Sequence, residues 1–168
     1  MSKITNSTGL ESSVFPYYAG SSTATSTSVQ DPIINGWSQQ GNPGDPVYFD
    51  ATTGPWLANY GIYLVNYDIT VTPASVGSFV SVVLLQDGGN IVEGSAVGAF
   101  TSSEVIKLSA TAMVSVTKDR FVMPSSLSLR MLLTGTEATA PAGTTVQVAN
   151  MTITLIVDEG RSGTNGRS

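Results

Sequence analysis

Residues 61–73 read GIYLVNYDITVTP, and the alternation within this stretch decides the fold class. Apolar side chains occupy every second position from Tyr63 to Val71, and a period of two residues is typical of a β-strand with one face in a hydrophobic core. The opposite row begins with Ile62 and Leu64 and then turns polar at Asn66. One end of this strand is therefore predicted to have two apolar faces.

The same period recurs along the rest of the chain. Residues 79–97 predict two strands around the turn Asp87-Gly88-Gly89-Asn90, where a glycine pair suits a tight hairpin. Alternating rows also occupy residues 106–116, 126–133 and 151–157. No segment combines a helical period with helix caps. The sequence therefore predicts an all-β protein with two antiparallel sheets packed face to face.

The chain is long enough for a single domain with a real core. We expect this domain to span residues 14–158, between flexible tails at residues 1–13 and 159–168. The Ser/Thr-rich residues 19–28 read as a low-complexity, linker-like stretch. Residues 30–55 are rich in turn formers and predict short strands joined by long loops.

Composition excludes several functions. Charged residues make up 11% of the chain against about 25% in ordinary soluble domains, and the net charge is −5 with scattered basic residues, so no nucleic-acid partner is expected. The chain has no Cys and no His, which excludes thiol nucleophiles, imidazole bases and the usual zinc ligands. No signal-peptide core or membrane-spanning apolar run is present in the sequence, so no membrane partner is expected.

Apolar residues on the second faces of the strands need a cover, because a sandwich in water needs only one apolar face per strand. No helix is predicted to supply it, which favours other copies of the chain over the alternative that loops from residues 30–55 fold across. The residues predicted to lie at an interface between copies come from two strands: Ile62, Leu64, Phe79, Val83 and Leu85.

The order of these features resembles the tumour necrosis factor-like and complement globular-head superfamily. The central-strand pattern G-x-Y-x-V-x-Y of that superfamily corresponds to Gly61, Tyr63, Val65 and Tyr67. Within it, residues 55–158 are most similar to globular domains of bacterial exosporium proteins. The resemblance implies a jelly roll that assembles as a tight homotrimer. The chain lacks the Gly-X-Y repeat and the proline-rich targeting segment of the collagen-like exosporium glycoprotein, so no filament stalk is encoded in it.

The residue types present allow three kinds of site, and a structural role competes with each. Paired carboxylates could catalyse hydrolysis, but the sequence gives no reason to pair any two of Asp45, Asp50, Asp68, Glu93 and Glu104. Asp31, Asp45 and Asp50 could bind calcium, although they follow no ordered loop pattern. Sugars could stack on aromatic side chains, for which core or interface packing is the favoured role: Tyr17, Tyr18, Trp37, Tyr48, Trp56 and Tyr60.

These considerations lead to a non-enzymatic structural protein without cofactor or metal. We expect a homotrimeric building block of a bacterial spore surface layer, resembling the exosporium, whose partners are copies of itself and other surface-layer proteins. The alternative is a trimeric lectin-like or receptor-binding head, on a phage or fibre tip, that binds a ligand between protomers. An enzyme with a carboxylate pair is the least favoured hypothesis.

Overall fold

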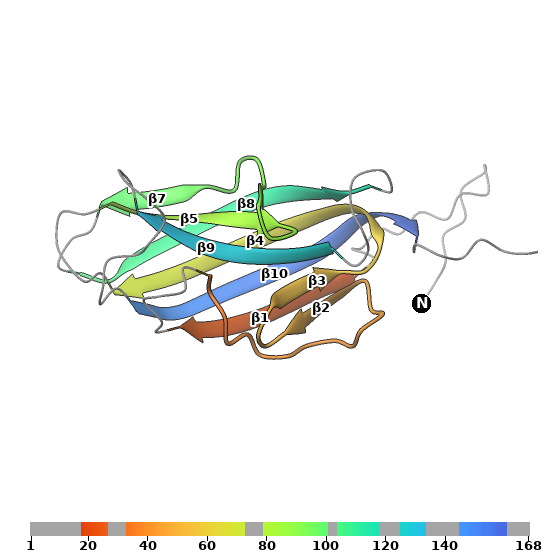
Figure 1. The fold of residues 1–168 in the computed structure, drawn as a ribbon, viewed down its shortest axis with the longest axis horizontal. Coiled ribbons are helices and arrows are strands. Elements are labelled where there is room, and N and C mark those ends of the chain that lie inside the picture. The colour runs from red at the N-terminus through yellow and green to blue at the C-terminus, as the bar shows by residue number, and fades with distance from the viewer. Residues whose placement is uncertain are drawn as a thin grey trace, which may run out of the picture.

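The computed structural model describes residues 18–26, 33–72, 79–100, 104–117, 125–133 and 145–160, and every regular element in these ranges is a β-strand (Figure 1). The strands are β1 Tyr18–Ser26, β2 Val47–Asp50, β3 Gly54–Leu57, β4 Tyr60–Thr72, β5 Phe79–Gln86, β6 Asn90–Ile91, β7 Val97–Phe100, β8 Ile106–Val116, β9 Ser125–Leu133 and β10 Thr145–Gly160. None of the described residues forms a helix that could cross a membrane.

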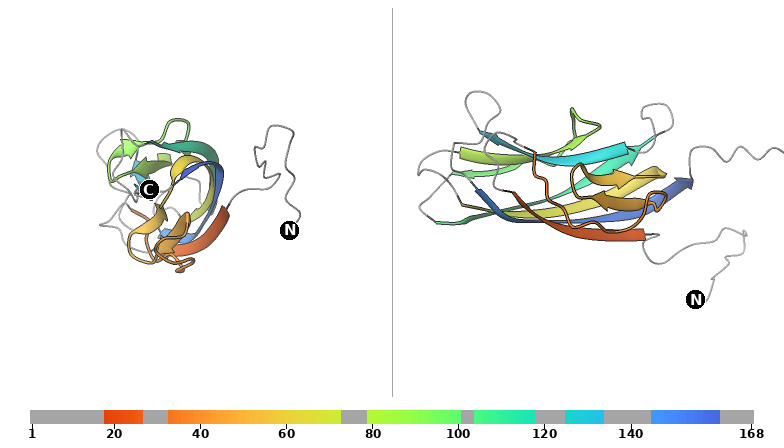
Figure 2. Two further views of the ribbon diagram at one scale, coloured as in Figure 1. Left: turned by 90° about the vertical axis from the view of Figure 1, so that its right-hand side faces the viewer. Right: turned by 60° about the horizontal axis from the view of Figure 1, so that its bottom comes forward.

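The strands form two antiparallel sheets that face each other (Figures 1 and 2). The four-stranded sheet has the order β1-β10-β4-β8, and the six-stranded sheet has the order β2-β3-β9-β5-β6 with β7 also paired to β5. Strands adjacent in space are mostly distant in sequence, as in a jelly roll. The predicted all-β sandwich is confirmed.

The opening stretch forms β4, between β8 and β10 in the four-stranded sheet. Its predicted apolar row faces the core, where Tyr63, Val65 and Ile69 are fully buried. The neighbouring strands continue the same layer in register, since Tyr63 lies opposite Leu155 of β10 and opposite Val114 of β8. The inner row of the other sheet, from β5, is equally buried: Val80, Val82 and Leu84. Burial of these side chains is the main stabilising contribution.

Two core tyrosines have hydroxyl groups that form hydrogen bonds with backbone carbonyl groups. The Tyr63 hydroxyl donates to the Asn59 carbonyl at 2.7 Å, and the Tyr67 hydroxyl donates to the Ser95 carbonyl. Burial raises the pKa of Tyr63 to about 12, and the pKa of Tyr67 likewise to about 12. Both side chains therefore remain neutral donors well above the pKa of a free tyrosine.

These shifts predict a loss of stability in alkali. Above pH 10 an unfolded chain releases both protons, whereas the folded chain retains them up to about pH 12. The unfolded state then binds fewer protons, so the free energy of unfolding decreases as the pH rises from about 10 to 12. Urea unfolding across this range should show the decrease, and a Tyr63→Phe/Tyr67→Phe variant should show a flatter profile. An equal decrease in both proteins would contradict this origin.

The structure corrects the interpretation of residues 19–28. Residues up to Ser26 belong to β1, an edge strand that pairs with β10 from Tyr18 opposite Leu155 to Ser26 opposite Val146. The Ser/Thr-rich composition suggested a linker, but backbone hydrogen bonding to a strand far away in the sequence gives this segment its structure. β-branched threonines are compatible with such an edge position.

Other expectations agree with the structure in outline. Residues 33–57 contain only the short strands β2 and β3, as predicted for a loop-rich region. The turn between β5 and β6 lies at the predicted place, but its positive φ angles belong to Asp87 and Gly88 rather than to the two glycines. At the C-terminal end β10 extends to Gly160, two residues beyond the expected domain boundary. The two predicted tails otherwise lie outside the described residues.

Candidate self-association surface

The outer face of the four-stranded sheet is apolar at one end. Ile62 and Leu64 of β4 point away from the core, because their neighbours Tyr63 and Val65 point into it. Leu64 lies opposite Met113 of β8, and Ile62 lies opposite Val157 of β10. Because directly opposed residues share a face of the sheet, these side chains adjoin one another.

Three apolar side chains at this end of the sheet are strongly exposed. Met113 is 67% exposed, Ile156 49% and Val157 44%. Together with the half-buried Ile62 and Leu64 they form what we call the apolar patch, defined as Ile62, Leu64, Met113, Ile156 and Val157. No charged residue belongs to it. Scattered exposed apolar residues are ordinary, but a group on one end of one sheet face is typical of an interaction surface.

A bulge in β10 shapes this patch. The pairing of β10 with β4 shifts register between Leu155 and Val157, so that Ile156 and Val157 are both exposed. Gly61 permits the close approach of the two strands there. It has a φ of 151°, and a Cβ on it would lie 1.9 Å from the carbonyl oxygen of Val157. The glycine of the G-x-Y pattern thus accommodates the bulge that exposes two of the five residues of the patch.

The other end of the same face is polar. Two rows of polar side chains cross the strands here and line a hollow of about 450 Å³. One row consists of Asn150, Asp68 and Ser109, and the other of Thr152, Asn66 and Thr111. Asn150 Nδ2 donates to Asp68 Oδ2 at 3.0 Å, and Thr111 Oγ1 donates to Asn66 Oδ1 at 2.7 Å. Asp68 therefore lies on the outer polar face, in the role that the sequence favoured over catalysis.

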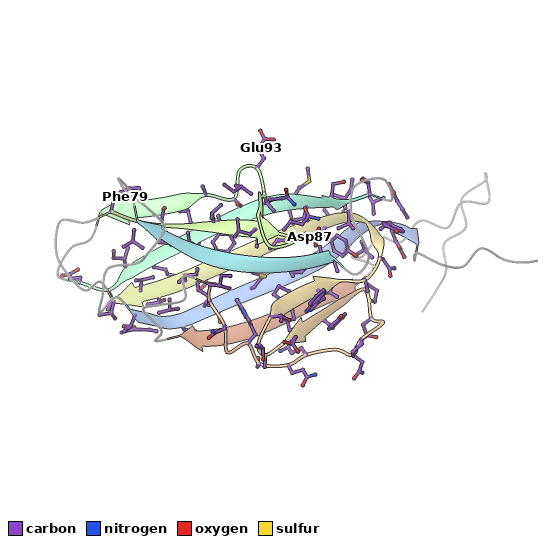
Figure 3. All side chains as sticks on the ribbon, viewed as in Figure 1. Phe79, Asp87 and Glu93 are labelled. Carbon is purple, nitrogen blue, oxygen red and sulfur yellow. The ribbon has the colours of Figure 1, made fainter. Side chains whose placement is uncertain are left out.

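The structure divides the predicted interface residues between the two sheets. Ile62 and Leu64 belong to the apolar patch, whereas Phe79, Val83 and Leu85 lie on β5 in the six-stranded sheet. Val83 and Leu85 are only 3% and 4% exposed, so a single chain already covers them. Phe79, labelled in Figure 3, lies beside Gly98 of β7, where a Cβ would come within 2.6 Å of its ring. One flat interface cannot contain all five residues, and their role between copies stays a prediction.

Sequence reasoning missed Met113, Ile156 and Val157. A signal was present for two of them. Met113 interrupts an otherwise polar row of β8, and Ile156 continues the row of Thr152 and Thr154 with an apolar side chain. Val157 carried no such signal, because alternation assigns it to the core row of Leu155 and only the bulge turns it outward.

The acidic candidates do not gather into a site. Asp45 lies in a loop, Asp50 at the end of β2 and Asp68 on the outer face of β4. Glu93 lies in the loop after β6, and Glu104 lies just before β8. Glu93 projects away from both sheets (Figure 3). Among the described residues no three acidic side chains come together in a way that could hold a metal ion. Asp31 of the calcium hypothesis lies outside the described residues.

The aromatic candidates separate into core and surface. Trp37 is 2% exposed and packs against Phe49 with ring centroids 6.0 Å apart, and Tyr60 is 7% exposed. Tyr48 and Trp56 are instead half-buried, and their rings are parallel to each other. Tyr17 lies outside the described residues. Core or interface packing was the favoured role for these residues, and core packing is confirmed for Trp37 and Tyr60.

Comparisons with known proteins address the fold. No family model matches the sequence, and no curated protein sequence is significantly similar to it. Eiger TNF from S. frugiperda superposes with a TM-score of 0.54 at 12% identity, covering 92% of this chain and 99% of its own. Murine APRIL gives a TM-score of 0.51 at 10% identity, covering 82% and 100%. The globular domain of zebrafish complement 1qA gives a TM-score of 0.43 at 11% identity, covering 82% and 97%.

The superpositions on Eiger TNF and murine APRIL define the class of fold. It is an all-β jelly roll with the tumour necrosis factor-like fold, as the G-x-Y-x-V-x-Y strand predicted. At such low identities the likeness concerns the fold alone. The expected relation to spore proteins stays a prediction.

Proposed function

We propose that this protein is a non-enzymatic module that functions as a homotrimer and associates through the apolar patch. The patch supports this most directly, because five apolar side chains meet on one end of a sheet face that no helix of the described residues covers. Burial of exposed apolar surface contributes about 25 cal/mol per Å² to association. A trimeric state is what the resemblance to the tumour necrosis factor-like superfamily implies.

The distribution of charge around the patch supports the same proposal. Interfaces are depleted of charged residues at their centre and retain them at the rim. On β4 the first charged residue of the outer row is Asp68, well beyond Leu64. On β10 the patch is followed by Asp158, which accepts a hydrogen bond from Asn59 at 3.0 Å, and by the exposed Glu159. An uncharged centre with a carboxylate border fits a surface that docks on another copy.

The replacement Leu64→Asp tests the proposal. Light scattering of the wild-type protein should give about three times the chain mass of 17.4 kDa, and the variant should give the mass of one chain. The physical reason is that a carboxylate buried without a partner costs several kcal/mol. Leu64 is half-buried at the outer face, so the variant should retain its fold by circular dichroism.

Val105→Asp is the matched control. Val105 is 50% exposed just before β8, and the next residue, Ile106, pairs with Val71 at the end of the sheet away from the patch, so this variant should keep the wild-type mass. A monomeric wild type would refute self-association. A Leu64→Asp variant that stays trimeric while Val105→Asp dissociates would place the interface at the other end of the sheet instead.

Location in a bacterial spore surface layer is the finer part of the proposal. It is supported by the resemblance of residues 55–158 to exosporium proteins and by the low charge content of 11%, which suits a neutral coat. Labelling of intact spores of the source organism with an antibody against the folded domain tests it. Signal confined to the cytoplasm of vegetative cells would remove the spore assignment and leave the trimer proposal intact.

A further inference from the structure

The β2–β3 hairpin carries an aromatic pair on the outer face of the six-stranded sheet. Tyr48 lies opposite Trp56, while their neighbours Val47, Phe49 and Leu57 point into the core. The two rings are parallel within 7°, with centroids 6.3 Å apart. Rings stacked directly on each other would be about 3.5 to 4.0 Å apart. The two rings are thus parallel neighbours on this face, without the close contact of directly stacked rings.

Hydrogen bonds fix the orientation of the larger ring. Trp56 Nε1 donates to Thr53 Oγ1 at 2.8 Å, and this hydroxyl donates to Asp50 Oδ1 at 3.0 Å. The same carboxylate oxygen accepts the backbone N–H groups of Thr52 and Thr53 at 2.9 and 2.8 Å. The indole ring is thus held in place before any ligand arrives, which reduces the entropic cost of binding.

A carboxylate stands at the rim of this surface. All three hydrogen bonds to Asp50 end on Oδ1, and no group in the described part of the chain bonds Oδ2. Hydrogen bonds from the Thr53 and Thr52 backbone, and then from the Thr53 hydroxyl, lower the pKa of Asp50, so it stays ionised. Asp50 also lies close enough to Tyr48 to raise the pKa of that hydroxyl, after the larger effect of burial.

A glycine lets the preceding loop pack closely against Tyr48. Gly41 has a φ of 74°, and a Cβ on it would lie 3.2 Å from Tyr48 Cβ and 3.2 Å from Asp45 Oδ2. The same loop therefore carries a second acidic side chain on this side of the hairpin. Asp45 Oδ2 accepts the Asn42 backbone N–H at 2.8 Å, which fixes its position.

We propose that the Tyr48–Trp56 surface, with Asp50 at its rim, is a binding site for a neutral saccharide. A pyranose ring has an apolar C–H face and a border of hydroxyl groups, which match two parallel aromatic rings bordered by a carboxylate and a phenol hydroxyl. Two carboxylates disfavour phosphate and sulfate groups. This site is separate from the apolar patch, because it lies on the other sheet.

Saturation-transfer NMR with cellotetraose, chitotetraose and maltotetraose tests the proposal. At least one of the three should bind and should change the tryptophan emission, and the change reports on half-buried Trp56 because Trp37 is fully buried. Trp56→Leu should weaken binding at least about tenfold. Asp50→Asn should weaken it as well, and Tyr48→Phe should have a smaller effect because the ring remains.

Two controls make the outcome specific. Ile91→Ala removes a more exposed apolar side chain elsewhere and should leave binding unchanged. The Leu64→Asp protein should bind as the wild type does, so a failure of saccharide binding and a failure of self-association can be told apart. Absence of binding by all three tetrasaccharides would overturn the proposal. Undiminished binding by a folded Trp56→Leu variant, or binding of tetramethylammonium in place of the sugars, would overturn it too.

Discussion

Gly61→Ala is expected to destabilise the protein by at least about 3 kcal/mol, enough to leave little folded material at physiological temperature. The added Cβ would lie 1.9 Å from the carbonyl oxygen of Val157 and 3.1 Å from a methyl group of Leu155. The first of these is a backbone atom of the central strand β10, which cannot move without disturbing its pairing with β4. A φ of 151° is in addition unfavourable for alanine. Soluble yield and thermal unfolding would measure the effect.

Gly88→Ala separates the two contributions. Gly88 also has a positive φ, of 77°, but a Cβ there would meet nothing within 4 Å. The free energy of unfolding of this variant should therefore decrease only by the cost of a positive φ angle in alanine, about 1 to 2 kcal/mol. Equal losses for both variants would show that β4 and β10 do not approach as closely as described.

Trp37→Ala is expected to cost about 3 to 5 kcal/mol. Trp37 is the bulkiest of the fully buried side chains, it packs against Phe49, and its Nε1 donates to the Ile34 carbonyl at 3.1 Å. Its removal leaves a cavity and a buried carbonyl without a partner. Denaturant unfolding monitored by circular dichroism would give the change in the free energy of unfolding.

Trp56→Ala is the matched comparison, because both residues are tryptophans of the loop-rich region. Trp56 is only half-buried, and its indole N–H donates to a threonine hydroxyl instead of a core carbonyl. Trp56→Ala should therefore lower the free energy of unfolding clearly less than Trp37→Ala does. If Trp56→Ala proved as damaging as Trp37→Ala, the division of the aromatic residues into core and surface would be wrong.

The fold could be predicted from the sequence because the alternation of apolar and polar residues is a local signal. The row from Tyr63 to Val71 predicted the core side of β4 correctly, and the G-x-Y-x-V-x-Y pattern pointed to the tumour necrosis factor-like fold. The partner of each strand was not accessible in this way. Ile62 and Val83 look equivalent in sequence, yet they lie on different sheets and only Val83 is buried within the chain.

Other features of the surfaces depended on long-range structure. The Ser/Thr-rich β1 became a strand only through its pairing with β10, and Val157 faces outward only through the bulge. Trp37 and Trp56 both lie among turn residues, and nothing local indicated which one would enter the core. Alternation specifies which side of a strand is apolar, but the sheet topology determines what each side meets.

The strand order has a kinetic consequence. β10, the last strand in sequence, lies between β1 and β4 and pairs with both. A ribosome-bound chain that still lacks β10 has no partner for β1 and no neighbour on one edge of β4. The four-stranded sheet can therefore close only after synthesis has passed residue 160, and contacts this distant in sequence make folding slow. Until then the apolar rows of β4 are exposed to other nascent chains, which makes this interval the period of greatest risk of aggregation.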